Sequence, residues 1–162
     1  MRLRNVGGVG MACEFLYNEV QAVSLNAPVL LNASIPCTRG NVIHENGTGN
    51  FILRGSANNC NCFARYQVTF NGNIAIPEGG DVTPIAVALT VNGEPRLTSR
   101  AIYTPAAVDE YGNVTSTAII TVPRGCCFSL SVDAVPASAD PTVTPAPVIN
   151  VQNANLTVAR IA

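Results

Sequence analysis

The chain has 162 residues, of which 48% are hydrophobic and 12% are charged, and its formal net charge is −1. This length fits one domain with a sizeable core, and the composition excludes disorder, which requires low hydrophobicity and high net charge. All nine basic residues are arginines and no run of like charge occurs, so the sequence offers no electrostatic footprint for nucleic acid or an anionic membrane. No stretch approaches the roughly 20 apolar residues of a membrane-spanning helix.

The first segment, residues 1–15, is glycine-rich and has no hydrophobic period. We predict an arm outside the core, which is either disordered or an attachment device, and a single domain over residues 16–162. Glycines interrupt the apolar run of this segment, so it is a poor signal peptide. Sparse charge in the rest of the chain, together with many Asn, Thr and Ser, indicates a neutral polar surface. Either another subunit covers part of this surface, or the Asn and Thr residues simply lie on exposed strand faces.

Short strands are predicted next, because brief apolar runs alternate with turn residues. Residues 17–25 and 28–35 form an edge pair, and residues 41–46 and 50–54 form a hairpin around the Asn46-Gly47 turn. His44 is the only histidine. Since no catalytic or metal-ligating partner stands at a recognisable spacing from it, an ordinary strand histidine is the favoured interpretation.

Residues 65–77 carry the strongest pattern in the chain. Apolar side chains at Tyr66, Val68 and Phe70 alternate with polar ones, and the same parity continues through Ile74 and Ile76. Because successive strand side chains point to opposite faces, this pattern predicts a long central strand with one buried face. The Asn-Gly pair at positions 71–72 is also a strong hairpin signal, but the unbroken parity favours a continuous strand.

The rest of the chain shows the same two-residue period. Strands are expected at residues 84–91, 97–103, 113–122, 126–135 and 148–161. Residues 104–111 could hold one helical turn, the proline-rich residues 136–147 predict a surface loop, and a shift of apolar parity predicts a bulge near Asn153.

Six cysteines allow fifteen disulfide connectivities, and their spacing does not choose among them. Cys126 shares the parity of inward-facing residues, so a small buried hydrophobe is the favoured role. For the other five, disulfides within loops or between subunits come next, and a zinc site last, because the usual Cys-x-x-Cys spacing is missing. These five are Cys13, Cys37, Cys60, Cys62 and Cys127.

About ten strands with turn signals between them describe an all-β antiparallel jelly-roll sandwich. Over residues 66–76, 85–93 and 153–161, the chain resembles the complement globular-head and tumour necrosis factor-like superfamily. More narrowly, it is similar to bacterial and phage members such as the heads of exosporium collagen-like glycoproteins and of phage head fibres. The resemblance extends over about residues 17–162 and rests on strands and turns rather than on a reactive signature.

The resemblance implies a ten-stranded jelly roll that forms a compact homotrimer and acts by display or binding, without catalysis. It also implies a trimer interface near the threefold axis, formed by Tyr66, Val68, Phe70, Leu156, Val158 and Ile161. The chain has no Gly-x-y stalk before the head and more cysteines than such heads usually carry. These departures favour a particle-bound role over a spore-surface one.

Four functions were weighed. The favoured one is a non-enzymatic knob on a virion exterior, as a head fibre or capsid decoration, or on a bacterial cell or spore surface, attached through residues 1–15. The second is a receptor- or glycan-binding head that uses loops 78–83, 104–112 and 136–147. The third is a self-polymerising filament subunit that is cross-linked by disulfides through Cys13 and the Cys126-Cys127 pair. A hydrolase finds no support, because His44 stands in no nucleophile–base motif.

No cofactor or metal is predicted. Four carboxylates on turns could in principle hold calcium, but isolated carboxylates on turns are usually solvated. They are Glu78, Asp81, Asp109 and Glu110.

Overall fold

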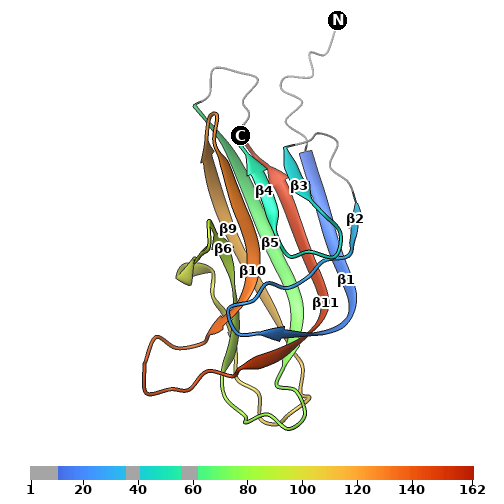
Figure 1. Ribbon diagram of the computed structural model, residues 1–162, viewed down its shortest axis with the longest axis vertical. Coiled ribbons are helices and arrows are strands. Elements are labelled where there is room, and N and C mark those ends of the chain that lie inside the picture. Colours follow the sequence, from blue (N-terminus) through green and yellow to red (C-terminus); the bar gives the residue numbers. More distant parts are fainter. Residues whose placement is uncertain (1–10, 36–40, 56–61) are drawn as a thin grey trace, which may run out of the picture.

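The computed structural model describes residues 11–35, 41–55 and 62–162, which form two antiparallel sheets packed face to face (Figure 1). The first sheet has five strands in the order β2-β1-β11-β5-β9. They are β1 (Met11–Ser24), β2 (Ala33–Ile35), β5 (Phe63–Ala75), β9 (Gly112–Pro123) and β11 (Val148–Arg160). The predicted jelly-roll sandwich is confirmed.

The second sheet has six strands, in which β3-β4-β10-β6-β7 follow one another and β8 also pairs with β6. Its strands are β3 (Val42–His44), β4 (Phe51–Arg54), β6 (Ile85–Val91), β7 (Glu94–Pro95), β8 (Ala101–Tyr103) and β10 (Cys127–Pro136). One short 3₁₀ turn, η1 (Leu97–Ser99), precedes β8. Both termini of the described chain lie at one end of the sandwich, and the β5–β6 and β10–β11 loops lie at the other (Figure 1).

Strand β5 is continuous through Asn71 and Gly72, as the parity predicts. It pairs with β9 on one side and β11 on the other, and Gly72 faces Val114 of β9 in unbroken register. A Cβ atom at Gly72 would lie 2.9 Å from the ring of Phe70, so glycine leaves the space that this ring occupies. Two-sided pairing satisfies the backbone groups that a hairpin turn would have released.

The core lies between the sheets and is built from alternate residues of the long strands. Tyr66, Val68, Phe70 and Ile74 of β5 are fully buried, and Leu156 and Val158 of β11 lie beside them. The predicted bulge in β11 is confirmed, since the register shifts between Gln152 and Asn155. Asn153 there has a φ of +53°, in the left-handed region that Asn tolerates better than most residues.

The predicted boundary of the arm at residue 15 is wrong. Strand β1 starts at Met11, pairs with β11 from the Met11–Arg160 step onward, and buries Cys13 and Phe15 in the core. The preceding glycines obscured this pattern, because only two inward-facing residues precede the predicted boundary. The remainder of the arm, residues 1–10, lies outside the described residues.

Two further predictions are corrected between β7 and β9. Residues 97–99 form η1 rather than a strand, because the Ser99 hydroxyl donates to the Arg96 carbonyl at 2.6 Å and accepts the Leu89 N–H at 3.0 Å. Residues 104–111 contain no helical turn. Their path is set instead by the Asp109 N–H, which donates to the Ile76 carbonyl at 2.8 Å.

Candidate interaction surfaces

The outer face of the five-stranded sheet is made of the side chains that alternate with the core residues. Neutral polar groups fill most of its paired positions. Its central rows are Gln67, Thr69, Asn71 and Asn73 on β5, Asn113, Thr115, Thr117 and Ile119 on β9, and Gln152, Asn155, Thr157 and Ala159 on β11. We refer to this surface as the outer face.

Hydrogen bonds link the polar side chains of the outer face across the strands. Thr115 donates to the Asn71 side-chain oxygen at 3.0 Å, and Asn113 donates to the Asn73 side-chain oxygen at the same distance. The hydroxyls of Thr69 and Thr117 are 3.1 Å apart. These groups therefore satisfy one another within the sheet, which lowers the cost of removing them from water.

Charge is scarce on the outer face. At its paired positions only Glu14 and Arg65 are charged, and the Glu14 carboxylate accepts a hydrogen bond from the Asn155 side chain. Large apolar side chains are exposed instead: Ile119 is 53% exposed, and Ile35 on the edge strand β2 is 55% exposed. Because β2 and β9 are the two edge strands of this sheet, the two isoleucines lie at its opposite edges. Scarce charge is therefore the feature that the outer face shares with surfaces that contact another protein.

The outward side of the six-stranded sheet differs from the outer face of the first sheet. Its outward-facing Ala86, Ala88 and Val135 are buried in a small separate cluster, against which Ala137 packs. This part of the second sheet is therefore covered within its own chain. The outer face of the first sheet has no such cluster among the described residues.

The residues predicted for a trimer interface are corrected by this geometry. Tyr66, Val68, Phe70, Leu156 and Val158 are fully buried between the two sheets of one chain, so they cannot contact a second chain. Ile161, at 43% exposure, is the one member of that set that a partner could reach. The apolar parity of each strand is used by the chain's own core, and a partner can only meet the opposite parity.

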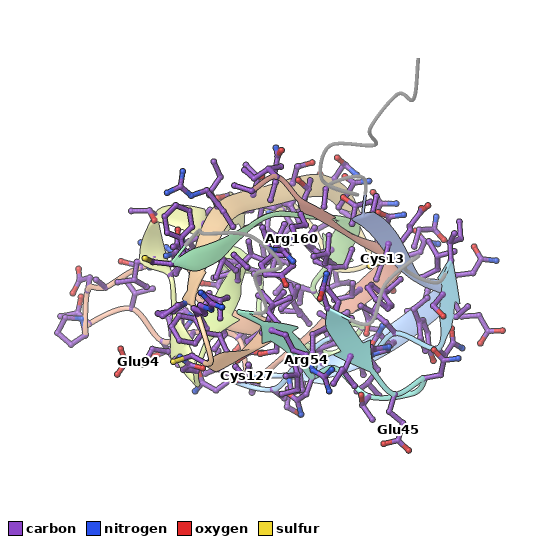
Figure 2. All side chains as sticks on the ribbon, turned by 90° about the horizontal axis from the view of Figure 1, so that it is seen from above. Cys13, Glu45, Arg54, Glu94, Cys127 and Arg160 are labelled. Carbon is purple, nitrogen blue, oxygen red and sulfur yellow. The ribbon has the colours of Figure 1, made fainter. Side chains whose placement is uncertain are left out.

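Three cysteines lie at the end of the sandwich where the described chain begins and ends, which Figure 2 views along the long axis. Cys62, Cys126 and Cys127 are exposed free thiols. The Arg124 N–H donates to the Cys62 carbonyl at 2.9 Å, which holds the start of β5 beside the β9–β10 turn. Cys126 occupies this turn rather than the core, so its predicted burial is wrong.

Disulfide predictions divide in two. Cys13 is disulfide-bonded, as predicted for a member of the candidate set, whereas Cys62 and Cys127 make no disulfide within the chain. Both of the latter are exposed at strand ends, so a link from either of them to another subunit stays a prediction. Cys37 and Cys60 lie outside the described residues.

His44 belongs to an aromatic cluster at the edge of the sandwich. Its ring stacks on Phe51 with centroids 4.1 Å apart and meets the edge of Phe15 at 4.9 Å, and its Nε2–H donates to the Thr48 carbonyl at 3.0 Å. The Nδ1 atom is buried without a hydrogen-bond partner. These contacts use the imidazole to join the two sheets, as expected for an ordinary strand histidine.

A cavity of about 430 Å³ opens at the opposite end of the sandwich, between the β5–β6 loop and the last residues of the β10–β11 loop. Ile76, Ala146 and Val148 are among its apolar lining residues, and Glu78 and Asp81 are its carboxylates. The β10–β11 loop is shaped by Asp140, which accepts the Thr142 N–H at 2.9 Å and the Thr142 hydroxyl at 2.8 Å. These two hydrogen bonds lower the pKa of Asp140.

Within residues 11–35, 41–55 and 62–162, no three His, Cys, Asp or Glu side chains come together as a metal-binding group. Among the described residues, Glu78 and Asp81 therefore share the cavity without a third carboxylate, histidine or cysteine beside them. Among the described residues, no helix has the length and apolarity that a membrane span requires.

Several solved structures have the same architecture. The globular domain of the zebrafish complement 1qA protein matches with a TM-score of 0.59 and 15% identity over 94% of this chain and 98% of that chain. The chain has a C1q/TNF-like jelly-roll fold. Eiger TNF from S. frugiperda matches with a TM-score of 0.66 and 14% identity over 94% and 93% of the two chains. Murine APRIL at pH 8.5 matches with a TM-score of 0.55 and 9% identity over 94% and 99%.

No protein-family model matches the sequence, and no curated protein is significantly similar to it. Identities of 15% or less mean that the likeness concerns the fold, which tolerates many sequences with the same alternation. The outer face and the cavity must therefore be interpreted from this chain's own residues.

Proposed function

We propose that this chain is a non-enzymatic structural protein, a homotrimeric jelly-roll knob displayed on a phage virion, as a head fibre or capsid decoration, or on a bacterial cell surface. The single observation that carries the proposal is the outer face: a weakly charged, hydrogen-bonded sheet surface with exposed isoleucines. The likeness to C1q and TNF domains supports the same kind of self-assembly.

Assembly through the outer face is favourable for a physical reason. Burying an unpaired charge costs several kcal/mol, whereas burying Thr and Asn side chains that already bond to each other costs far less. Ile35, Ile119 and Ile161 would add apolar area to the contact. A stable interface of ordinary size buries about 800 Å² on each partner, which a five-stranded sheet surface can supply.

Attachment to a larger particle remains part of the proposal, with the attaching segment shortened to residues 1–10. Strand β1 starts directly after this segment, at the same end as the C-terminus (Figure 1). Anchoring at that end would leave the β5–β6 and β10–β11 loops pointing away from the particle. Immunogold labelling of particles and cells from the source culture would reveal the chain on their exterior, and its absence from both would contradict the display role.

The mass of the protein in solution tests the assembly directly. We expect three chain masses by sedimentation equilibrium for the natural sequence and one chain mass for Ile119→Arg, because a guanidinium that the contact buries on the edge strand β9 loses its water. Ile102→Arg is the matched control: Ile102 is 51% exposed against 53% for Ile119, but it lies on β8 of the other sheet. A natural chain that stays monomeric at high concentration contradicts the proposal.

A receptor-binding head is the second candidate function, favoured by the cavity at the loop end. The loops that line this cavity include two of the three that the sequence predicts for binding. Pull-down of a defined receptor by the natural chain, but not by a chain with a filled cavity, would favour this function.

A further inference from the structure

The cavity between the β5–β6 and β10–β11 loops has a buried apolar floor and an exposed rim. Ile76 in the floor is 1% exposed, and Ala146 and Val148 are half-buried. The turn around Gly79 forms the rim, where Glu78 and Asp81 are exposed. Its volume of about 430 Å³ lies in the lower part of the range of about 300–1,000 Å³ that is usual for ligand sites.

Hydrogen bonds tie the walls of the cavity to the body of the domain. The Gly80 N–H donates to the Pro77 carbonyl at 3.0 Å and closes the turn, while the Leu25 N–H donates to the Pro147 carbonyl at 2.9 Å. Proline at positions 77, 145 and 147 restricts the backbone further. A cavity with restrained walls loses little conformational entropy when a ligand enters.

Acidic groups dominate this end of the molecule. Glu78 and Asp81 are the ionisable side chains that line the cavity, and no basic residue lines it. The neighbouring loops add further carboxylates, whereas arginines gather at the opposite end, where Figure 2 shows Arg54 and Arg160. Arg100 also reaches this end of the sandwich, where its guanidinium donates to the Pro136 carbonyl at the start of the β10–β11 loop at 3.2 Å, but it does not line the cavity. The field at the cavity therefore attracts cations and repels anions.

We propose that this cavity binds a segment of a partner protein in which an apolar side chain stands next to a basic one. The apolar side chain enters the floor formed by Ile76, Ala146 and Val148, and the ammonium or guanidinium stays at the rim beside Glu78 and Asp81. The rim residues from Glu78 to Asp81 are exposed, so the partner's chain can pass over them. This inference rests on the binding-head candidate and names its ligand class, which is the opposite in charge to an acidic glycan.

Nuclear magnetic resonance titration of the full chain with three matched peptides tests the proposal. The peptides are acetyl-Gly-Leu-Arg-Gly-amide, acetyl-Gly-Leu-Glu-Gly-amide and acetyl-Gly-Ser-Arg-Gly-amide. We expect the Leu-Arg peptide to shift the amides of Gly79, Gly80, Asp81, Ala146 and Val148 at millimolar concentration, and the other two peptides to bind at least severalfold more weakly. Added salt should weaken the binding of the Leu-Arg peptide, because it screens the exposed charges.

Substitutions separate the two parts of the site. Glu78→Gln and Asp81→Asn should each lower the affinity for the Leu-Arg peptide by about two- to fivefold, which is the size of effect expected for an exposed ion pair. Glu45→Gln is the matched control, because Glu45 points outward from the flank (Figure 2). Thr83→Phe should fill the cavity and abolish binding, with an unchanged far-ultraviolet spectrum as evidence that the chain is folded.

Several outcomes would overturn the proposal. Equal binding of the Leu-Glu peptide would make the carboxylates irrelevant, and shifts mapped outside the two loops would put the site elsewhere. Binding of hexylammonium as tightly as the Leu-Arg peptide would indicate a small free amine, and pocket shifts that depend on protein concentration alone would indicate a second copy of the chain. The sedimentation mass, measured separately, shows whether assembly itself has failed.

Discussion

The inner and outer faces of β5 have different tasks, although they alternate along one strand. Tyr66, Val68 and Phe70 are fully buried against the opposite sheet, whereas Gln67 and Asn71 on the same backbone are exposed. Inner residues contribute to folding through lost apolar surface. Outer residues contribute little to folding and are free to contact a second chain.

This difference explains the incorrect interface prediction. An apolar stripe is the most visible pattern in the sequence, and it was assigned both to the core and to the trimer axis. One side chain cannot be buried in its own sandwich and also against a neighbour. In the proposed assembly, a second chain can therefore meet only the polar residues that the alternation leaves outside.

The largest expected effect belongs to the inner face. Phe70→Ala should lower the free energy of unfolding by about 3–5 kcal/mol, because it removes a fully buried ring and leaves a cavity. Gln67→Ala, on the outer face of the same strand, should change the free energy of unfolding by less than about 0.5 kcal/mol. Urea unfolding at one fixed chain concentration measures both, and equal effects would remove the distinction between the faces.

A smaller effect is expected for the hydroxyl of Tyr66, which donates to the Arg54 carbonyl at 2.5 Å. Tyr66→Phe should cost about 1 kcal/mol of unfolding free energy at neutral pH. Burial raises the pKa of Tyr66 above 10.0. Its contribution is therefore complete below about pH 10 and is lost as the pH rises through the raised pKa, because the unfolded chain ionises first.

The alkaline loss of stability should be reduced in Tyr66→Phe. The pKa of Tyr103 is raised as well, by desolvation and by its hydrogen bond to Glu110. The double variant Tyr66→Phe, Tyr103→Phe should therefore lose even less stability as the pH rises. Thermal unfolding between pH 8 and pH 11 measures this slope. An unchanged slope in Tyr66→Phe would show that the tyrosine ionises equally in both states.

The smallest effect belongs to the hydrogen bonds of the outer face. Thr115→Val removes the donor to Asn71 and should lower the unfolding free energy by about 0.2–1 kcal/mol. Thr98→Val, on the exposed η1 turn, is the control. A loss above about 2 kcal/mol would mean that the outer face contributes to stability far more than a solvated sheet surface can.

The sequence predicted only part of the candidate site. The loops around Glu78 and Pro145 were predicted as binding segments, but their meeting across one cavity depends on β5 and β11 being neighbours in the sheet. Composition predicts the neutral surface, and the polar parity of residues 65–77 predicts its exposed side, but the sequence does not show which strands lie side by side to form it. The predictions for Cys126 and residues 97–99 are wrong because local turns interrupt the alternation. The Cys126 N–H donates to the Pro123 carbonyl, and the Ser99 N–H donates to the Arg96 carbonyl.

The two-residue period by itself determined that this chain is an antiparallel sandwich, because long strands with one apolar face can bury that face only against a second sheet. It also determined the continuous β5 and the bulge at Asn153. Only the tertiary structure decided that β1 starts at Met11, which strands lie side by side to form the outer face, and where the loops enclose a cavity. Those features depend on pairing between residues far apart in the chain, such as Met11 and Arg160, which no local pattern encodes.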